Sequence, residues 1–144
     1  MQNGQGFAMG LMQRWFAGDD STSHDKGQHR LAWHSLEDSS GLEAAIQRSH
    51  DHPVLLFKHS TRCSISAMAL ERLQRGWDIP PAVVQPWLLD LIQHRDISNA
   101  IAERLGVMHQ SPQAILLRHG RVVWHASHSA ISMAALKQAM AEAA

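Results

Sequence analysis

The sequence predicts one α/β domain built on a central mixed sheet of four to five strands, with helices on both faces. Short apolar runs alternate with segments of helical periodicity over residues 31–106. Two further apolar runs follow, separated by the turn dipeptide His119-Gly120, and an alanine-rich segment closes the chain. The predicted order is therefore βαβαβαββα, in which helices can cover both faces of the sheet. A chain of 144 residues is long enough to form such a domain around a proper core.

The first half of this pattern contains two strands and two helices. Residues 31–36 form the first predicted strand. Ser40 and Glu43 have the spacing of a capping box, which predicts a helix whose buried face holds Leu42, Ala45 and Ile46. Pro53 opens the second strand, which covers residues 54–58. The next helix is expected over residues 63–74, with Met68, Ala69 and Leu73 toward the core and Gly76 at its end.

The second half contains the remaining strands and two more helices. Residues 87–92 form the third predicted strand, and Ser98 is expected to cap a short helix that ends at Gly106. The runs 114–118 and 121–125 form a predicted hairpin. The final helix is expected over residues 133–142, where alanine is the commonest residue.

The domain is expected to cover residues 29–144, and residues 1–28 are expected to be a helical extension and a linker. Apolar side chains between Phe7 and Phe16 recur at helical spacing, whereas residues 19–28 are polar and rich in turn formers. The extension is expected to dock on the domain or to remain a loose tail.

Composition narrows the range of functions. The formal charge is zero, with 13 basic and 13 acidic side chains, so nothing favours binding to nucleic acid or to an anionic membrane. No secretory signal or transmembrane run is visible. The chain has one cysteine, so it can form no intrachain disulfide, and this fits a reducing compartment. We therefore expect a cytoplasmic protein without integral membrane association.

The single cysteine, Cys63, stands where the second strand has ended and the next helix begins. A helix start offers free N–H groups and the positive end of the helix dipole, which favour a thiolate, and Lys58 and Arg62 add positive charge. A thioredoxin-type site also needs a proline that faces the cysteine across the sheet. Pro112 precedes an apolar strand and meets that need, so the Ser111–Pro112 bond is expected to be cis. The sequence therefore contains the parts of a thioredoxin-type site.

The residue at position 66 indicates the type of reaction. Oxidoreductases with two cysteines carry Cys-x-x-Cys, whereas this chain has Cys63-Ser64-Ile65-Ser66. Ser66 is expected to donate a hydrogen bond to the Cys63 thiolate, but it cannot attack a disulfide. Cys63 would therefore take a small thiol from a protein mixed disulfide, and a second small thiol would regenerate it.

The segment from Phe57 to Ser66, Phe-Lys-His-Ser-Thr-Arg-Cys-Ser-Ile-Ser, resembles the active-site signature of YtxJ-type monothiol bacilliredoxins of the thioredoxin superfamily. Residues 94–99, residues 109–113 and Ser127-His128 resemble further motifs of that family, in the same order. The resemblance covers about residue 31 to the C-terminus. It implies a thioredoxin-like fold and removal of bacillithiol from S-bacillithiolated proteins. It implies that Cys63 is the nucleophile, that Pro112 is the cis-proline, and that Arg95 and His109 lie in the surrounding shell.

The residues expected to bind the substrate lie on both sides of the cysteine and beside the proline. Lys58 and Arg62 are candidates to contact a carboxylate of the small thiol, and His59 is a candidate to tune the thiolate. The full expected set is Lys58, His59, Thr61, Arg62 and Ser111. The expected partners are S-thiolated proteins and a small thiol, bacillithiol or glutathione, which acts as co-substrate, and no tightly bound cofactor is expected.

Other interpretations of the same residues remain open at this point. A cysteine can be a buried apolar side chain without reactivity. A monothiol module with Cys-x-x-Ser can also carry a bridging iron–sulfur cluster, and a thioredoxin fold can serve as an adaptor without turnover. No metal site of the chain's own is expected, because His50, His52, His125 and His128 form no recognised zinc spacing with Cys63.

Overall fold

The computed structural model describes residues 31–144. The predicted extension over residues 1–28 lies outside the described residues. In the described part, strands and helices alternate up to the final hairpin, as the sequence predicts. The elements are β1 (His34–Ser35), α2 (Ser39–Arg48), β2 (Val54–His59), α3 (Ser64–Arg75), β3 (Gln85–Asp90), α4 (Arg95–Leu105), β4 (Gln113–Arg118), β5 (Arg121–Ser127), the 3-10 helix η2 (His128–Ala130) and α5 (Met133–Ala143).

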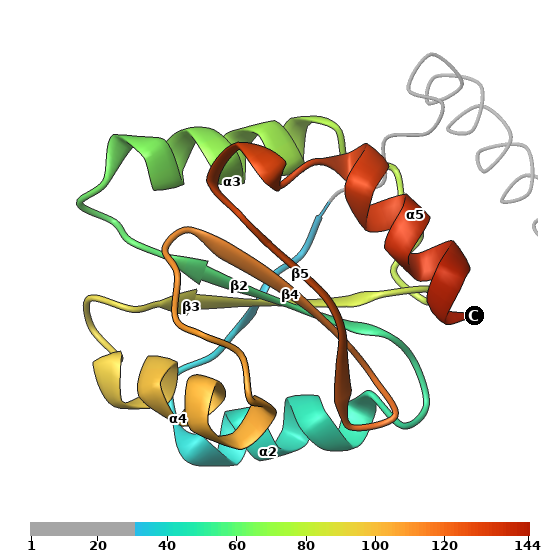
Figure 1. The fold of residues 1–144 in the computed structure, drawn as a ribbon, viewed down its shortest axis with the longest axis horizontal. Helices are drawn as coiled ribbons and strands as arrows, with labels where there is room; N and C mark the ends of the chain where they lie inside the picture. Colours follow the sequence, from blue (N-terminus) through green and yellow to red (C-terminus); the bar gives the residue numbers. More distant parts are fainter. Residues whose placement is uncertain (1–30) are drawn as a thin grey trace, which may run out of the picture.

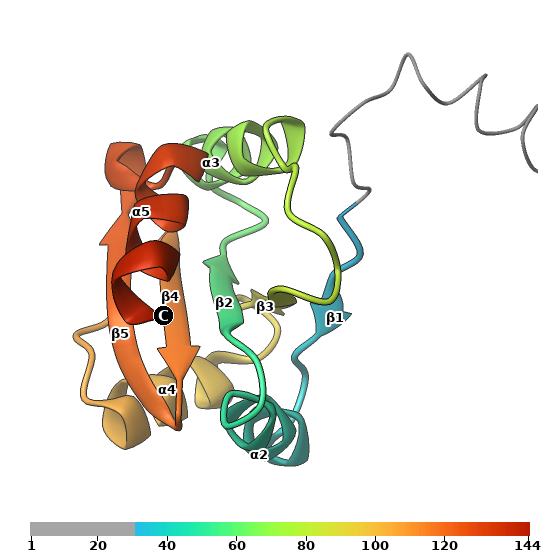
Figure 2. The same ribbon diagram turned by 90° about the vertical axis from the view of Figure 1, so that its right-hand side faces the viewer.

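The strands form one mixed five-stranded sheet in the order β1-β3-β2-β4-β5 (Figure 2). β3 pairs in parallel with both β1 and β2, whereas β4 pairs antiparallel with β2 and with β5. β2 lies at the centre, and its first five residues, Val54 to Lys58, are fully buried. The predicted α/β class and mixed sheet are therefore confirmed.

Helices cover both faces of this sheet, α3 and α5 on one face and α2 and α4 on the other (Figure 1). Alternation along β2 divides the core between the two faces. Leu55 and Phe57 pack with residues of α3 and α5, whereas Val54 and Leu56 pack with residues of α2 and α4. Because both faces of the sheet are covered, residues 54–57 form a continuous apolar run.

Two predicted helix starts are wrong, in each case because the helix begins earlier. Asp38 caps α2, and its carboxylate oxygen accepts hydrogen bonds from the Gly41 N–H at 2.8 Å and from the Ser40 hydroxyl at 2.7 Å. The helix begins at Ser39, so Ser40 lies inside it and is not its cap. α4 begins after His94, and Ser98 is a buried residue within it.

The third strand also differs from its predicted range. β3 ends at Asp90, two residues before the predicted end, because its parallel register with β2 runs from Gln85 opposite Val54 to Asp90 opposite His59. An Asp90 carboxylate oxygen then accepts a hydrogen bond from the Ile92 N–H at 3.1 Å. Such a local side-chain bond competes with the ladder and turns the chain.

Smaller differences concern β1, β5 and one side chain. β1 has only two residues and pairs with β3 alone, at one edge of the sheet. β5 continues to Ser127, and η2 follows where no helix was predicted. Met68 was expected toward the core but is 63% exposed. α3 instead buries Ser66, Ala69 and Leu73, which share one face at the spacing of a helix.

Among residues 31–144, no helix is both long and apolar enough to cross a membrane.

Candidate active site

Three connections lie at one end of the sheet, where β2 and β3 end and β4 begins (Figure 1). They are the connections from β2 to α3, from β3 to α4 and from α4 to β4. β2 leads through residues 60–62 to Cys63, the residue before α3. Lys58 lies opposite Gln113 in the antiparallel pairing of β2 with β4. Pro112, which precedes Gln113, therefore enters the sheet beside the end of β2. The cysteine loop and the proline loop are far apart in the sequence. The register of β2 with β4 brings them to the same end of the sheet.

Cys63 is a half-buried free thiol at the N-cap position of α3. Its backbone is extended, with φ −115° and ψ 121°, and its carbonyl accepts the first helical hydrogen bond, from the Ala67 N–H at 3.0 Å. The Cys63 N–H donates to the Ser60 carbonyl at 3.2 Å, which closes a tight turn before the helix. This position sets the sulfur at the positive end of the helix dipole, where an anion is favoured.

The peptide bond between Ser111 and Pro112 is cis, as the sequence analysis expects. The Pro112 carbonyl accepts a hydrogen bond from the His128 N–H at 3.3 Å, so η2 lies against this loop. Ser111 is half-buried. Its Oγ is shielded from solvent and makes no hydrogen bond within residues 31–144.

Ser66 is fully buried on the first turn of α3, and its hydroxyl makes two hydrogen bonds that the sequence did not predict. Ser66 Oγ lies 2.7 Å from His59 Nδ1 and accepts a hydrogen bond from the Ser60 N–H at 3.0 Å. The expected hydrogen bond from Ser66 to the Cys63 sulfur does not occur in the described structure. The end of β2 places His59 and Ser60 directly under the helix start, and these two residues engage the hydroxyl first.

His59 is half-buried at the end of β2, on the face that α3 covers. Burial lowers the pKa of its imidazole, and the negative charge of Asp90 opposes this by raising it. Asp90 lies directly opposite His59 in the register of β2 with β3. Sequence reasoning missed Asp90. Its position as an acidic residue within the predicted apolar strand 87–92 was a signal, but only the register pairs it with His59.

Lys58 was expected to contact the substrate, and this expectation is wrong for the described structure. The side chain is fully buried, and its Nζ makes no hydrogen bond within residues 31–144. Burial lowers the pKa of Lys58 from 10.5 to about 8. Because neighbouring residues of a strand point to opposite faces, Lys58 lies away from the α3 face that His59 occupies. Its charge acts on His109, where burial and the positive charges of Lys58 and Arg95 lower the pKa.

The other predicted contact residues lie around the cysteine. Thr61 and Arg62 are exposed in the turn just before Cys63, and Ser111 is at the neighbouring loop. Ile65 and Met68 are apolar residues on the exposed side of α3, at 55% and 63% exposure, and Met108 before the proline loop is 79% exposed. The turn before Cys63 is thus polar, and the exposed side of α3 after it carries apolar side chains.

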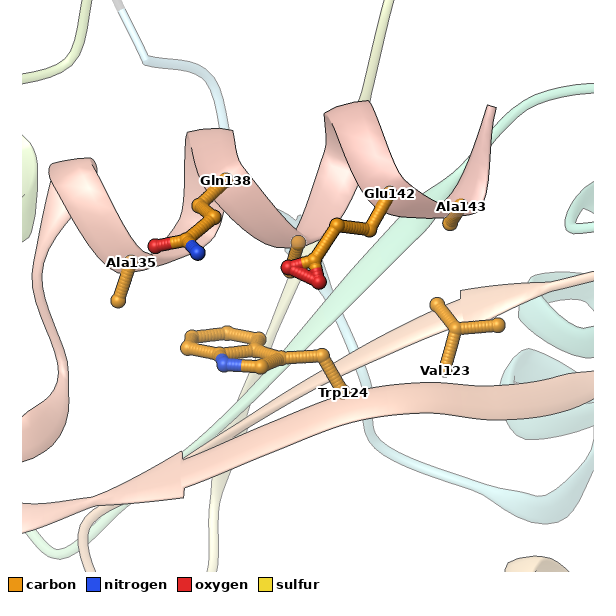
Figure 3. A pocket seen from close by; sticks show the side chains of 7 residues that line it. Val123, Trp124, Ala135, Gln138, Glu142 and Ala143 are labelled. Atoms are coloured by element: carbon orange, nitrogen blue, oxygen red, sulfur yellow. The ribbon is translucent and has the colours of Figure 1, made fainter.

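Other candidate sites in the described chain lack comparable chemistry. Within residues 31–144, no three histidine, cysteine or acidic side chains gather closely enough to hold a metal ion. A pocket of about 370 Å³ lies between β5 and α5, lined by residues that include Trp124, Gln138 and Glu142 (Figure 3). None of the residues predicted for the active site lines this pocket.

Comparisons with known proteins agree with this geometry. The model of the family described as monothiol bacilliredoxin BrxC matches residues 34–136. A solved structure described as a candidate oxidoreductase with a thioredoxin fold is 31% identical, with a TM-score of 0.64, over 73% of this chain and 90% of that one.

More distant thioredoxins share the fold. The thioredoxin of Trypanosoma brucei brucei is 12% identical with a TM-score of 0.63, over 80% of this chain and 93% of its own. The thioredoxin of Malassezia sympodialis is 13% identical with a TM-score of 0.59, over 79% and 96%. The predicted thioredoxin-like fold is therefore confirmed.

Proposed function

This chain belongs to the monothiol bacilliredoxin family, and on that premise we propose that it is a thiol–disulfide oxidoreductase that removes a low-molecular-weight thiol from protein mixed disulfides. The family and the thioredoxin fold indicate redox activity. The observation that carries the proposal is the position of Cys63: a half-buried free thiol at the start of α3, at the same end of the sheet as the cis-proline Pro112.

In the first step, the Cys63 thiolate attacks the sulfur of the small thiol within the mixed disulfide. A disulfide forms between Cys63 and the small thiol, the original disulfide breaks, and the protein substrate leaves as a thiolate that takes a proton from water. The helix start favours the attacking thiolate, because the free N–H groups and the dipole stabilise negative charge there.

In the second step, a second small thiolate attacks the small-thiol sulfur on Cys63. This attack releases the symmetric small-molecule disulfide and restores the Cys63 thiolate. The external thiol is required because position 66 is a serine, whose hydroxyl cannot displace a disulfide sulfur. The net reaction consumes one free small thiol for each protein thiol released, and the small thiol acts as a co-substrate.

The proposed substrate contacts come from the two loops at this end of the sheet. Thr61 and Arg62 are exposed beside Cys63, and Arg62 can pair with a carboxylate of the small thiol. The backbone around Ser111 is proposed to meet the extended segment of the protein substrate. The small thiol is bacillithiol or glutathione, and both carry carboxylates that Arg62 could recognise.

Replacing the nucleophile tests the mechanism. We expect Cys63→Ser to abolish removal of the small thiol from an S-thiolated model protein, because a serine hydroxyl does not displace a disulfide sulfur. The measurement is mass spectrometry of the model protein over time, with bacillithiol and glutathione adducts offered in separate reactions. Ser64→Ala, a neighbouring serine change at an exposed position, is the control and should retain activity.

The outcomes separate the possible functions. Transfer that persists in Cys63→Ser at the wild-type rate would exclude Cys63 as the nucleophile. A wild-type protein that exchanges no thiol with either adduct would favour the adaptor function. Colour and bound iron after anaerobic purification with the small thiol present would instead favour a cluster carrier.

A further inference from the structure

We propose that His59 is a positioning residue that controls, through the Ser66 hydroxyl, whether the Cys63 thiolate receives a hydrogen bond. The inference rests on the proposed function in that it assigns a role within the same site. Its evidence is the pair of hydrogen bonds at Ser66. With these two bonds in place, the only thing that can change is which atom accepts the hydroxyl proton.

The Ser66 hydroxyl can take part in at most three hydrogen bonds. A serine hydroxyl has one proton to donate and two lone pairs that accept. One lone pair accepts the Ser60 N–H at 3.0 Å. The 2.7 Å contact with His59 Nδ1 uses either the proton of the hydroxyl or its second lone pair, depending on whether Nδ1 carries a hydrogen.

Cys63 is the neighbour that can use the hydroxyl proton when His59 does not. Cys63 is the N-cap of α3 and Ser66 follows three residues later, on the first turn. Residues three apart on a helix lie on the same side, so the side chains of Cys63 and Ser66 share one side of the helix start. Ser66 is fully buried, so water does not compete for its proton.

Two states of the site follow from this count. When His59 is protonated, its Nδ1–H donates to Ser66, both lone pairs of the hydroxyl are filled, and the hydroxyl proton is free to donate to the sulfur. When His59 is neutral with its proton on Nε2, the Ser66 proton donates to Nδ1 and the sulfur receives nothing. For a neutral ring with its proton on Nε2, protonation of His59 therefore stabilises the thiolate at low pH, whereas a neutral ring with its proton on Nδ1 would leave the bond to the sulfur unchanged.

The charged and titratable groups near His59 come from β3, from the start of α3, from β2 itself and from η2. Asp90 faces it from β3 and favours its protonated form, whereas burial favours the neutral form and lowers its pKa. From α3 it faces Ser66 and, at the helix start, Cys63. Lys58 precedes it on β2 but points to the other face, and its positive charge acts on His109. His128 lies beyond Pro112, to which it is hydrogen bonded.

Alkylation of Cys63 by iodoacetamide across the pH range tests the inference, since Cys63 is the only thiol in the chain. We expect wild type to show two coupled ionisations. At a pH below the titration of His59, wild type should be alkylated up to about tenfold faster than Ser66→Ala, because a hydrogen bond to a charged group is worth about that factor.

Two variants should change the profile in different ways. His59→Phe keeps a ring of similar shape but cannot accept the Ser66 proton, so that proton is free for the sulfur at every pH. A single ionisation should result, with its midpoint about one pH unit lower than the upper wild-type midpoint. Ser66→Ala should also show one ionisation, at the upper wild-type midpoint, and the double variant should match Ser66→Ala.

The control is His125→Phe, an exposed histidine on β5, which should keep the wild-type profile. A single wild-type ionisation would overturn the inference, because it would mean that the state of His59 does not reach the sulfur. Two ionisations that survive in Ser66→Ala would also overturn it, since they would show direct action of the histidine charge.

A reciprocal measurement needs no change in the buried pair. By linkage, formation of the thiolate must raise the pKa of His59 by the same factor. Titration of the His59 ring by NMR should therefore show two steps in wild type and one in Cys63→Ser, and one step in both proteins would refute the coupling. Neither experiment needs a mixed-disulfide substrate, so failure of the proposed function and failure of this inference can be told apart.

Discussion

Neighbouring residues of one strand have opposite roles in this site. His59 points to the face under α3 and bonds Ser66, whereas Lys58, one position earlier, is buried on the other face without a hydrogen-bond partner in residues 31–144. Both precede the cysteine, and the sequence suggested that both act on the substrate. The period of two along a strand separates them, so the Lys58 side chain does not contact solvent and its charge acts inside the fold.

This burial predicts that Lys58 costs stability at neutral pH. An unfolded lysine titrates near 10.5, whereas the folded pKa of Lys58 is about 8. Between these values the unfolded chain binds more protons than the folded one, so stability rises as the pH rises from about 8 to about 10.5. Below pH 8 the full cost is present.

We therefore expect Lys58→Met to raise the free energy of unfolding at pH 7, by up to roughly 3 kcal/mol, and to remove the rise between pH 8 and 10.5. Methionine can fill the space of the lysine stem. Urea unfolding at a series of pH values measures both effects. Lys137→Met, at an exposed ion pair with Asp78, is the matched control, and an equal gain in that variant would contradict the argument.

Among the elements, α3 contacts both parts of the site, the cysteine turn and the segment that follows β5. Its first turn holds Cys63 and Ser66, and its side chain Arg72 reaches the segment after β5. Arg72 Nε and Nη2 donate to the Ile131 carbonyl at 3.1 and 2.9 Å, and Nη2 also donates to the His128 carbonyl at 3.1 Å. His128 is in turn bonded to Pro112. One helix thus holds the thiol and supports the segment behind the proline.

We expect Arg72→Met to lower the free energy of unfolding by about 1 to 3 kcal/mol, because hydrogen bonds from a charged donor are lost and the carbonyl of buried Ile131 is left without a partner. Arg75→Met on the same helix is the control. Arg75 is exposed and pairs only with Glu71 in the described structure, so its loss should cost about 0.5 kcal/mol or less. Equal losses in both variants would show that Arg72 is no more than a surface charge.

At the scale of the whole molecule, one sheet joins two separate cores. Leu55 and Leu56 are adjacent and fully buried, yet Leu55 packs under α3 and α5 and Leu56 over α2 and α4. The central position of β2 makes every helix depend on the same strand. The domain should therefore unfold as one cooperative unit.

We expect Leu55→Ala and Leu56→Ala each to lower the free energy of unfolding by about 2 to 5 kcal/mol, in a single transition for each variant. Urea unfolding followed by circular dichroism and by tryptophan fluorescence should give coincident curves, because Trp77 belongs to one core and Trp87 to the other. Val123→Ala, an exposed position on β5, should cost far less. Separate transitions for the two leucine variants would refute a single unit.

The sequence by itself determined the features that depend on local signals. The apolar runs and the glycines fixed most of the elements, since Gly106 and Gly120 both have positive φ at the turns where they were expected. The position of Cys63 at a helix start and of Pro112 before a strand also followed from the residues nearby. These features were predictable because neighbouring residues alone set them.

Only the tertiary structure decided how the side chains of the site meet. The bond from Ser66 to His59, the position of Asp90 opposite His59 and the burial of Lys58 all depend on strand register and on how α3 lies over β2. A shift of one residue in register would exchange the faces of His59 and Lys58. Spacing along the chain does not determine that register, because it results from the packing of both cores.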